Sequence, residues 1–254
     1  MNIIEEVVLS QTQRVDDLGV CSLKIIQDKS GFCFGVDAVL LANFTKMRKG
    51  YIGADLGTGT GIIPLLLLGK SEVAKIYAFE IQEEVASMAR KSFELNSLED
   101  RAEVICDNLK RVADYLEPSS LDFVVSNPPY MKADGMQNTN EKKRISRHEV
   151  ACTLEDVFVS ASYLLKEQRS FYLVHRPNRL CDIFELSRKY SLEPKEMRFI
   201  YPYPGKAANL LLLKMVKNGR PDLKMLPPLY LYDENRMENE ELQSIYYSTG
   251  LEEE

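Results

Sequence analysis

The amino-acid sequence predicts an α/β fold with a doubly wound, mostly parallel sheet, and three observations lead to this expectation. From Tyr51 onward, short strand-like segments alternate with longer helix-like segments. A glycine-rich turn at residues 55–61 joins the first of these strands to the first helix, and polar residues end the strands that follow. Repeated β-α units of this kind imply parallel strands, with ligands at the carboxyl ends of the strands.

The segment before this core is expected to form a β-hairpin and a helix. Residues 22–27 are strand-like, residues 28–31 have turn composition, and residues 32–34 resume a strand. The apolar segment 36–47 then predicts a mostly buried helix, with Asp37 near the positive end of the helix dipole.

The core elements follow one another at short intervals. The helix at residues 83–95 is well marked because Val85, Ala89 and Phe93 share one face. The final strands, at 197–201 and 210–216, are joined by a connection too short for a helical crossover, which predicts an antiparallel hairpin. The other expected strands are residues 51–56, 75–79, 102–106, 121–126 and 170–175, and the other expected helices are residues 61–68, 109–116, 154–165 and 179–190.

We expect one overall domain, because no break in composition divides the chain. It would comprise an N-terminal extension (1–50), a core (51–219) and a tail (220–254). The polar segment 131–150 is expected to be a long mobile loop, and loops of that length are usually functional or disordered. The tail is expected to be strand-like or irregular, and then frayed at its acidic end.

The composition is that of a soluble globular protein, with 254 residues of which 45% are hydrophobic and 28% charged. The net charge of -6 gives no global sign of nucleic-acid binding, so such binding would need a local basic patch. Five scattered cysteines without a CxxC motif, with only two histidines, argue against a zinc site or a disulfide framework. With no signal peptide or membrane span expected, we predict a cytoplasmic monomer without a metal.

Four successive strand ends are expected to meet at one edge of the sheet. The glycine turn could serve a dinucleotide, another nucleoside ligand or no ligand at all. Glu80 stands where such folds place a carboxylate for ribose hydroxyls, although a strand-ending Glu is as often only solvated. Asp107 ends the third strand, where either it or Asn108 could instead cap the next helix. The residues that end the fourth strand are Asn127, Pro128, Pro129 and Tyr130, which taken alone could mark a simple turn.

Together these strand ends resemble a class I S-adenosylmethionine-dependent methyltransferase, over roughly residues 30–216. Asn-Pro-Pro-Tyr is the signature of amino-methyltransferases in that class, which act on planar nitrogens of bases or of a glutamine amide. The resemblance implies S-adenosylmethionine as cofactor, with its methionine moiety at the glycine loop, its ribose at Glu80 and its adenine at Asp107. The other residues assigned to the cofactor by this resemblance are Asp55, Gly57, Thr58, Gly59, Gly61, Asn108 and Asn127.

The Asn-Pro-Pro-Tyr motif at 127–130 suits a target amine that is a poor nucleophile. The lone pair of an exocyclic adenine amine is delocalised into the ring, so two acceptors on its hydrogens would help to turn the lone pair outward. The Asn127 side-chain oxygen and the Pro128 carbonyl are the expected acceptors, and Pro128 and Pro129 fix the backbone between them. Tyr130 is expected to offer a face for stacking of the target base, a contact worth roughly 1–3 kcal/mol. Positioning would then supply most of the catalysis, without a strong general base.

Three further segments narrow the resemblance. They are Phe-Cys-Phe-Gly-Val-Asp-Ala-Val-Leu-Leu-Ala-Asn-Phe at 32–44, Ser-Arg-His-Glu at 146–149 and His-Arg-Pro at 175–177. Together they resemble the bacterial tRNA1(Val) adenine-N6 methyltransferase family, and this resemblance runs nearly end to end. It implies that the substrate is RNA, a tRNA in particular, and that Phe34, Gly35 and Asp37 help to close over the cofactor. His175 is expected to be structural.

Contacts to the phosphates of the RNA are expected from the basic residues of the segment 131–150, although most short basic runs are only solvated surface. Three other enzymes remain as alternatives: a glutamine-N5 methyltransferase of release factors, an rRNA guanine-N2 methyltransferase and a DNA adenine methyltransferase. A non-catalytic RNA-binding module is the alternative from a different class. The loop residues expected to contact RNA are Lys142, Lys143, Arg144, Arg147 and His148.

Overall fold

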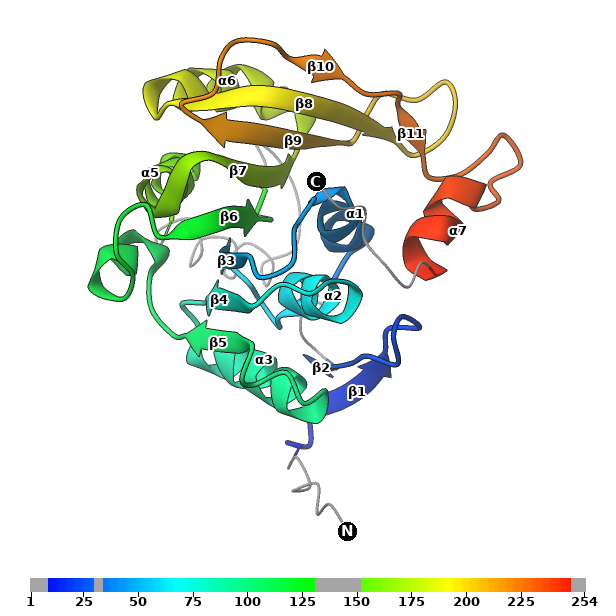
Figure 1. Cartoon of the computed structure of the whole chain (residues 1–254). Coiled ribbons are helices and arrows are strands. Elements are labelled where there is room, and N and C mark those ends of the chain that lie inside the picture. The colour runs from blue at the N-terminus through cyan, green and yellow to red at the C-terminus, as the bar shows by residue number, and fades with distance from the viewer. Residues whose placement is uncertain (1–8, 30–33, 131–151, 248–254) are drawn as a thin grey trace.

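The computed structural model describes residues 9–29, 34–130 and 152–247 (Figure 1). Within them a nine-stranded sheet forms the centre of the molecule. Its parallel part has the order β7-β6-β3-β4-β5, so the chain winds one way from β3 and returns to the other side of β3 with β6. That reversal makes the carboxyl ends of β3 and β6 the topological switch point, where ligands bind in such sheets. These five strands are β3 (Ile52–Leu56), β4 (Lys75–Phe79), β5 (Ala102–Ile105), β6 (Leu121–Ser126) and β7 (Leu165–His175).

The remaining strands extend the sheet beyond β7. β9 (Leu210–Lys217) runs antiparallel to both β7 and β8 (Leu192–Tyr201), which confirms the predicted C-terminal hairpin. The short strands β10 (Lys224–Met225) and β11 (Leu229–Tyr230) lie parallel to β8 along its outer edge. The doubly wound, mostly parallel fold predicted from the sequence is therefore confirmed.

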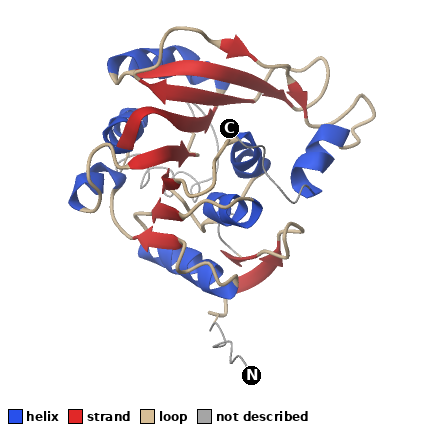
Figure 2. Ribbon diagram, in the orientation of Figure 1, coloured by secondary structure: helices blue, strands red, loops and turns tan. Residues whose placement is uncertain are grey.

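Helices cover both faces of the sheet (Figure 2). Alternate side chains of a strand point to opposite faces, so Phe123 and Val125 join one hydrophobic cluster and Val124 the other. The first cluster contains α1 (Val36–Phe44), α2 (Ile62–Lys70), α3 (Glu83–Leu95) and α7 (Glu240–Tyr247). The second contains the 3₁₀ helix η1 (Leu109–Asp114), α5 (Leu154–Leu164) and α6 (Leu180–Lys189), which follows a 3₁₀ turn at Pro177–Arg179.

The N-terminal hairpin exists, but its two strands are not the expected pair. β1 (Gln13–Asp17) pairs antiparallel with β2 (Lys24–Asp28), and Phe34 lies outside any strand. β2 is held against α3 by side chains, because the Ile26 amide donates to Ser92 Oγ at 2.9 Å. β1 was missed because its sequence, QRVDD, has a single apolar residue and no alternating pattern.

Several predicted boundaries were wrong, and each has a local cause. α1 ends at Phe44 because Thr45 has extended backbone, with its hydroxyl bonded to the Leu41 carbonyl oxygen at 2.7 Å. β7 begins directly after α5, at Leu165, without the expected loop. The tail contains the short strands β10 and β11, as expected, but then forms the helix α7, which the sequence pattern did not predict. Burial of Leu242 and Ile245 holds that helix in place.

The contact between β3 and β6 gives a stability prediction. Gly53 pairs with Phe123, and a Cβ added at Gly53 would lie 2.3 Å from Phe123 Cζ. Because this ring is 1% exposed and has no room to move, Gly53→Ala should lower the free energy of unfolding by about 1–3 kcal/mol or more. Urea denaturation measures this, and Phe123→Leu in the same chain should recover part of the loss. Unchanged stability of Gly53→Ala would contradict the packing described.

Candidate active site at the strand carboxyl ends

The ends of the four central strands line one pocket. Residues that follow β3, β4, β5 and β6 meet there, because the carboxyl ends of neighbouring parallel strands share one edge. The structure thus brings together sequence-predicted residues from all four strand ends, as expected. Those among the pocket's lining residues are Gly57, Glu80, Asp107, Asn108, Pro128 and Pro129.

The glycine loop between β3 and α2 has a backbone that only glycine adopts easily. Gly57, Gly59 and Gly61 have φ values of +85°, +58° and +87°. The amides of Gly57 and Thr58 both donate to the Phe79 carbonyl oxygen, at 3.0 and 2.8 Å. The loop therefore folds back onto the end of β4, and this brings it beside Glu80.

Asp55 is a buried carboxylate for which the described part of the chain supplies no hydrogen bond of ordinary geometry. Its side chain is 0% exposed, and neither of its oxygens nor the Thr58 hydroxyl is hydrogen-bonded within the described residues. Burial raises the pKa of Asp55 to about 7; the nearby Thr58 hydroxyl opposes this increase and the Glu80 carboxylate adds to it. An unpaired carboxylate at the head of a glycine loop is a ready partner for a cation such as an ammonium group.

Glu80 and Asp107 are held in fixed orientations. Glu80 is 6% exposed and accepts hydrogen bonds from the Gly59 amide at 3.1 Å and the Gln82 amide at 3.0 Å. Asp107 accepts from the Tyr115 hydroxyl at 2.6 Å, and this bond, with the Asn108 amide, lowers the pKa of Asp107. Both acids keep lone pairs that could accept hydrogens from a bound ligand.

Asn108 caps the 3₁₀ helix η1, as one of the two sequence interpretations expected. Its side-chain oxygen accepts a hydrogen bond from the Lys110 amide at 3.0 Å. Asn108 also lines the pocket, so capping and a ligand contact are compatible at this position.

Tyr130 is half-buried, and both its hydroxyl and its ring contact other residues. Its hydroxyl lies 2.8 Å from Asn127 Oδ1 and 2.9 Å from Asp37 Oδ2, and its single proton can be donated to only one of them at a time. The Arg176 guanidinium lies over the ring at 4.7 Å, and the His175 ring meets Tyr130 edge to face at 5.4 Å. A target base would therefore have to displace Arg176 to stack on that side of Tyr130.

Phe34, Gly35 and Asp37 lie around the start of α1. Phe34 donates its amide to Gln27 Oε1 at 3.0 Å, and Gly35 precedes the first turn of α1. Asp37 is joined to the Asn-Pro-Pro-Tyr segment through Tyr130. Among the described lining residues of the pocket, none of these three is present, so their part in closing over a cofactor stays a prediction.

A second pocket lies against the same two prolines, which the sequence predicted as site residues, and contains His175, which was expected to be structural; its other residues were not predicted. Pro128, Pro129 and Cys152 line both pockets. The other lining residues of the second pocket are Thr153, Leu154, His175 and Arg179. The position of His175 at the end of β7 was the available signal, because that strand neighbours β6 at the same sheet edge.

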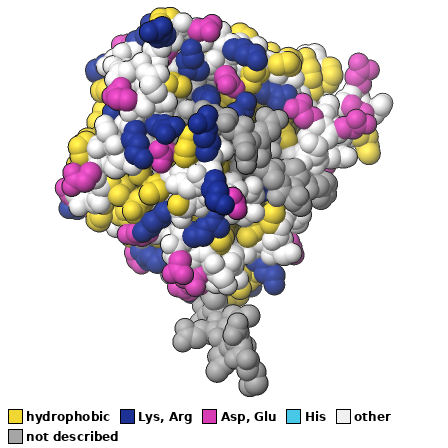
Figure 3. Space-filling model, viewed as in Figure 1, with side chains coloured by type: hydrophobic (Ala, Val, Ile, Leu, Met, Phe, Trp, Pro, Cys, Tyr) yellow, Lys and Arg dark blue, Asp and Glu magenta, His cyan; other side chains and the backbone are white. Residues whose placement is uncertain are grey.

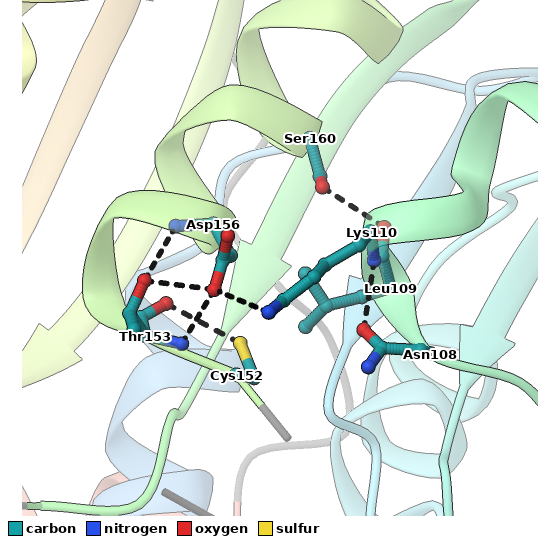
Figure 4. Close-up of polar contacts among 7 residues, drawn as sticks. All are labelled: Asn108, Leu109, Lys110, Cys152, Thr153, Asp156 and Ser160. Carbon is teal, nitrogen blue, oxygen red and sulfur yellow. Dashed lines mark hydrogen bonds and ion pairs between the residues drawn. The ribbon is translucent and has the colours of Figure 1, made fainter. Parts of the chain in front are cut away.

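The shared wall of the two pockets is anchored at the start of α5 (Figure 4). The Thr153 hydroxyl and the Asp156 carboxylate form a capping box, and Lys110 adds an ion pair to Asp156 at 3.2 Å. On the other side, Ser160 Oγ donates to the Leu109 carbonyl oxygen at 2.9 Å. These contacts tie the segment that follows Asp107 to the segment that begins at Cys152.

Loss of the capping box should destabilise the protein measurably. Thr153→Ala removes the hydroxyl that accepts from the Asp156 amide at 3.2 Å, and such substitutions cost about 0.5–2 kcal/mol. Equilibrium unfolding in urea should show this loss, whereas Thr153→Ser keeps the hydroxyl and should unfold close to wild type. Equal stability of all three proteins would show that the box contributes nothing.

The basic residues expected to contact RNA (Lys142, Lys143, Arg144, Arg147 and His148) lie outside the described residues. In the space-filling view, Lys and Arg side chains form groups near the middle of the face, with acidic side chains between and around them (Figure 3). Within the described ranges, no cluster of three or more His, Cys, Asp or Glu side chains could hold a metal ion. No helix in those ranges is long and apolar enough to cross a membrane.

Comparisons with known proteins point in one direction. The family model of the methyltransferase small domain matches residues 29–174. A protein of Bacteroides thetaiotaomicron named tRNA1(Val) (adenine(37)-N6)-methyltransferase is 27% identical over 198 residues, which cover 78% of this chain and 82% of that protein. A protein of the same name from Flavobacterium psychrophilum is 27% identical over 193 residues, 76% of this chain and 82% of its own length.

Two solved structures share the fold. A predicted O-methyltransferase from Agrobacterium tumefaciens has a TM-score of 0.70 at 23% identity, covering 86% of this chain and 99% of its own. TYW2 from Pyrococcus horikoshii, solved in complex with MeSAdo, has a TM-score of 0.58 at 16% identity, covering 84% of this chain and 74% of its own. At these identities the likeness extends to the fold alone.

Proposed function

The chain belongs to the methyltransferase small domain family, and from this membership we propose that it transfers a methyl group from S-adenosylmethionine to the exocyclic N6 of an adenine in tRNA. The observation that carries this proposal is the Asn127–Tyr130 segment, whose two prolines form the wall between the two pockets. The names of the curated relatives support adenine 37 of tRNA1(Val) as the target.

The residues of the first pocket fit the proposed cofactor. Asp55 is not itself a lining residue but directly precedes one, Leu56; it is a buried carboxylate with no hydrogen-bond partner among the described residues, and the α-ammonium of a methionine moiety would supply one. We assign Glu80 to the ribose hydroxyls and Asp107 to the adenine amine, each as a hydrogen-bond acceptor. When bound, the cofactor supplies an electrophilic sulfonium methyl group. The other residues that we assign to holding it are Gly57, Thr58, Gly59, Gly61 and Asn108, with Phe34, Gly35 and Asp37 closing over it.

The residues of the strand end would prepare the acceptor amine. Asn127 Oδ1 and the Pro128 carbonyl oxygen would accept its two hydrogens, which directs the nitrogen lone pair away from the base plane. Donation of the Tyr130 proton to Asp37 would leave Asn127 Oδ1 available for this task. The chain's contribution is then orientation of two reactants, which can supply a large part of a rate enhancement.

Labelling on separated substrates tests the proposal. The protein is incubated with methyl-labelled S-adenosylmethionine and, in separate reactions, total tRNA, rRNA, DNA and a release factor. Label in tRNA, mapped to an adenine N6, is the expected result. Label only in release factor or only in rRNA would identify one of the alternative enzymes. Cofactor binding without transfer to any of them would favour a non-catalytic module.

A further inference from the structure

The second pocket contains a neutral hydrogen-bond donor that the proposed transfer does not yet use. His175 ends β7, is 2% exposed and lines this pocket together with the two prolines. Its Nδ1 lies 2.8 Å from the Arg176 amide nitrogen but 3.5 Å from the Arg176 carbonyl oxygen. The shorter contact makes Nδ1 an acceptor, so the hydrogen of a neutral His175 ring is on Nε2.

The surroundings keep the His175 ring neutral. The pKa of His175 is lowered to about 4, chiefly by burial and also by the Arg179 and Arg176 charges, and a backbone contact to Arg176 and the Asp182 carboxylate partly oppose this. At neutral pH the ring is therefore a donor at Nε2 and an acceptor at Nδ1. No residue in the described part of the chain accepts a hydrogen bond from Nε2.

The other polar side chains of this pocket each have at least one partner. The Thr153 hydroxyl donates to Asp156 Oδ2 at 2.8 Å, and the Cys152 thiol contacts the Thr153 carbonyl oxygen at 3.3 Å. Arg179 is ion-paired with Asp182. His175 Nε2 and the terminal guanidinium nitrogens of Arg179 are thus the donors that a ligand in this pocket could meet, and of the two only the His175 ring is uncharged.

We propose that His175 Nε2 donates a hydrogen bond to an unprotonated ring nitrogen beside the reacting amine, and so determines how the target adenine is seated. This inference rests on the proposed function. In adenine two acceptor nitrogens are near the exocyclic amine, N1 on one side and N7 on the other. Pro128 lines both pockets, so a base whose amine is held at Asn127 and Pro128 would turn one of these edges toward the second pocket, which His175 also lines. A base with a hydrogen on that nitrogen would meet a second donor and be disfavoured.

Two enzyme variants separate the donor from the shape of the ring. His175→Phe keeps a ring but removes the donor and the acceptor, whereas His175→Asn keeps an amide that can both donate and accept. On unmodified tRNA1(Val) transcript, His175→Phe should lose about tenfold in kcat/KM, the effect of one hydrogen bond, and His175→Asn should lose less. Cofactor affinity and thermal midpoint, measured on both variants, show whether the first pocket and the fold are intact.

Substitution of the RNA completes the test without depending on a folded variant. Transcripts carry adenine, 1-deazaadenine or 7-deazaadenine at the methylated position. With one deaza transcript the wild-type enzyme should lose activity, and on that transcript wild type and His175→Phe should be equal. If that transcript contains 1-deazaadenine, His175 bonds to N1; if it contains 7-deazaadenine, His175 bonds to N7.

Three results would overturn the inference or its premise. Wild-type activity unaffected by either analogue would overturn the assigned hydrogen bond. So would a His175→Phe loss of the same size on all three transcripts. A wild-type enzyme that methylates no tRNA would instead contradict the proposed function.

Discussion

Replacing Asn127 with alanine is expected to reduce methyl transfer by about 10²–10³-fold, the effect seen when one preorganised hydrogen-bonding group is removed from a reacting atom. The reason is geometric, because Asn127 follows the last residue of β6 and directly precedes the two prolines that line both pockets. Without the side-chain oxygen, the target amine keeps its lone pair in the ring and meets the methyl group in the wrong orientation. Single-turnover kinetics with saturating tRNA and cofactor would measure the loss in the chemical step.

Two controls separate this role from cofactor binding and from folding. Affinity for S-adenosylmethionine, measured by calorimetry, should change little in Asn127→Ala. Asn127→Asp keeps an acceptor oxygen at the same place and should retain more activity than Asn127→Ala. Turnover within about threefold of wild type would refute the assigned role, and a parallel loss of cofactor affinity would reassign Asn127 to the cofactor.

The strand ends could be predicted from the sequence because they depend on local pattern. Each core strand is a short apolar run, and Glu80 and Asp107 follow directly after two of them. Once parallel strands are inferred, the meeting of their carboxyl ends follows without knowledge of any particular contact. The same reasoning placed His175 at this edge but gave no reason to expect an open hydrogen-bonding position there.

Contacts between distant segments could not be predicted. The bond from Tyr130 to Asp37 joins positions 93 residues apart, and no periodicity in either segment announces it. The helix α7 also depends on a distant contact, since the buried Lys70 side chain donates a hydrogen bond to the Ile245 carbonyl oxygen 175 residues away. Such contacts are selected by the assembled fold, which is why the sequence did not predict that Arg176 covers one side of the Tyr130 ring.

The second large effect is expected at Asp55. Replacing it with asparagine should raise the free energy of unfolding at pH 8 but lower the affinity for S-adenosylmethionine. The folded pKa of Asp55 is about 7, whereas an exposed aspartate titrates near 3.9. As the pH rises from about 4 to about 7, the unfolded chain releases this proton and the folded chain keeps it. The stability associated with Asp55 is therefore present at low pH and lost by about pH 7, with a total on the order of 4 kcal/mol.

Asparagine at position 55 does not titrate, so the difference from wild type should grow with pH. At pH 8 we expect Asp55→Asn to have the higher free energy of unfolding, by on the order of 2–4 kcal/mol, and at pH 4 the gain should vanish. Affinity for S-adenosylmethionine should fall by about 10²-fold or more at pH 8, because the ammonium group loses a buried ionic partner. Urea unfolding at pH 4, 6 and 8 and calorimetry at pH 8 measure the two effects.

Asp122 is the matched control, because it is also a buried aspartate of this sheet but has partners. Its carboxylate binds Lys166 Nζ at 2.9 Å and accepts from the Ile52 amide at 3.1 Å. Asp122→Asn should therefore lower the free energy of unfolding at pH 8, where Asp55→Asn raises it, and should leave cofactor affinity unchanged. If both variants are destabilised at pH 8, Asp55 has a partner in the folded protein without cofactor. If Asp55→Asn binds the cofactor as tightly as wild type, the ammonium group lies elsewhere.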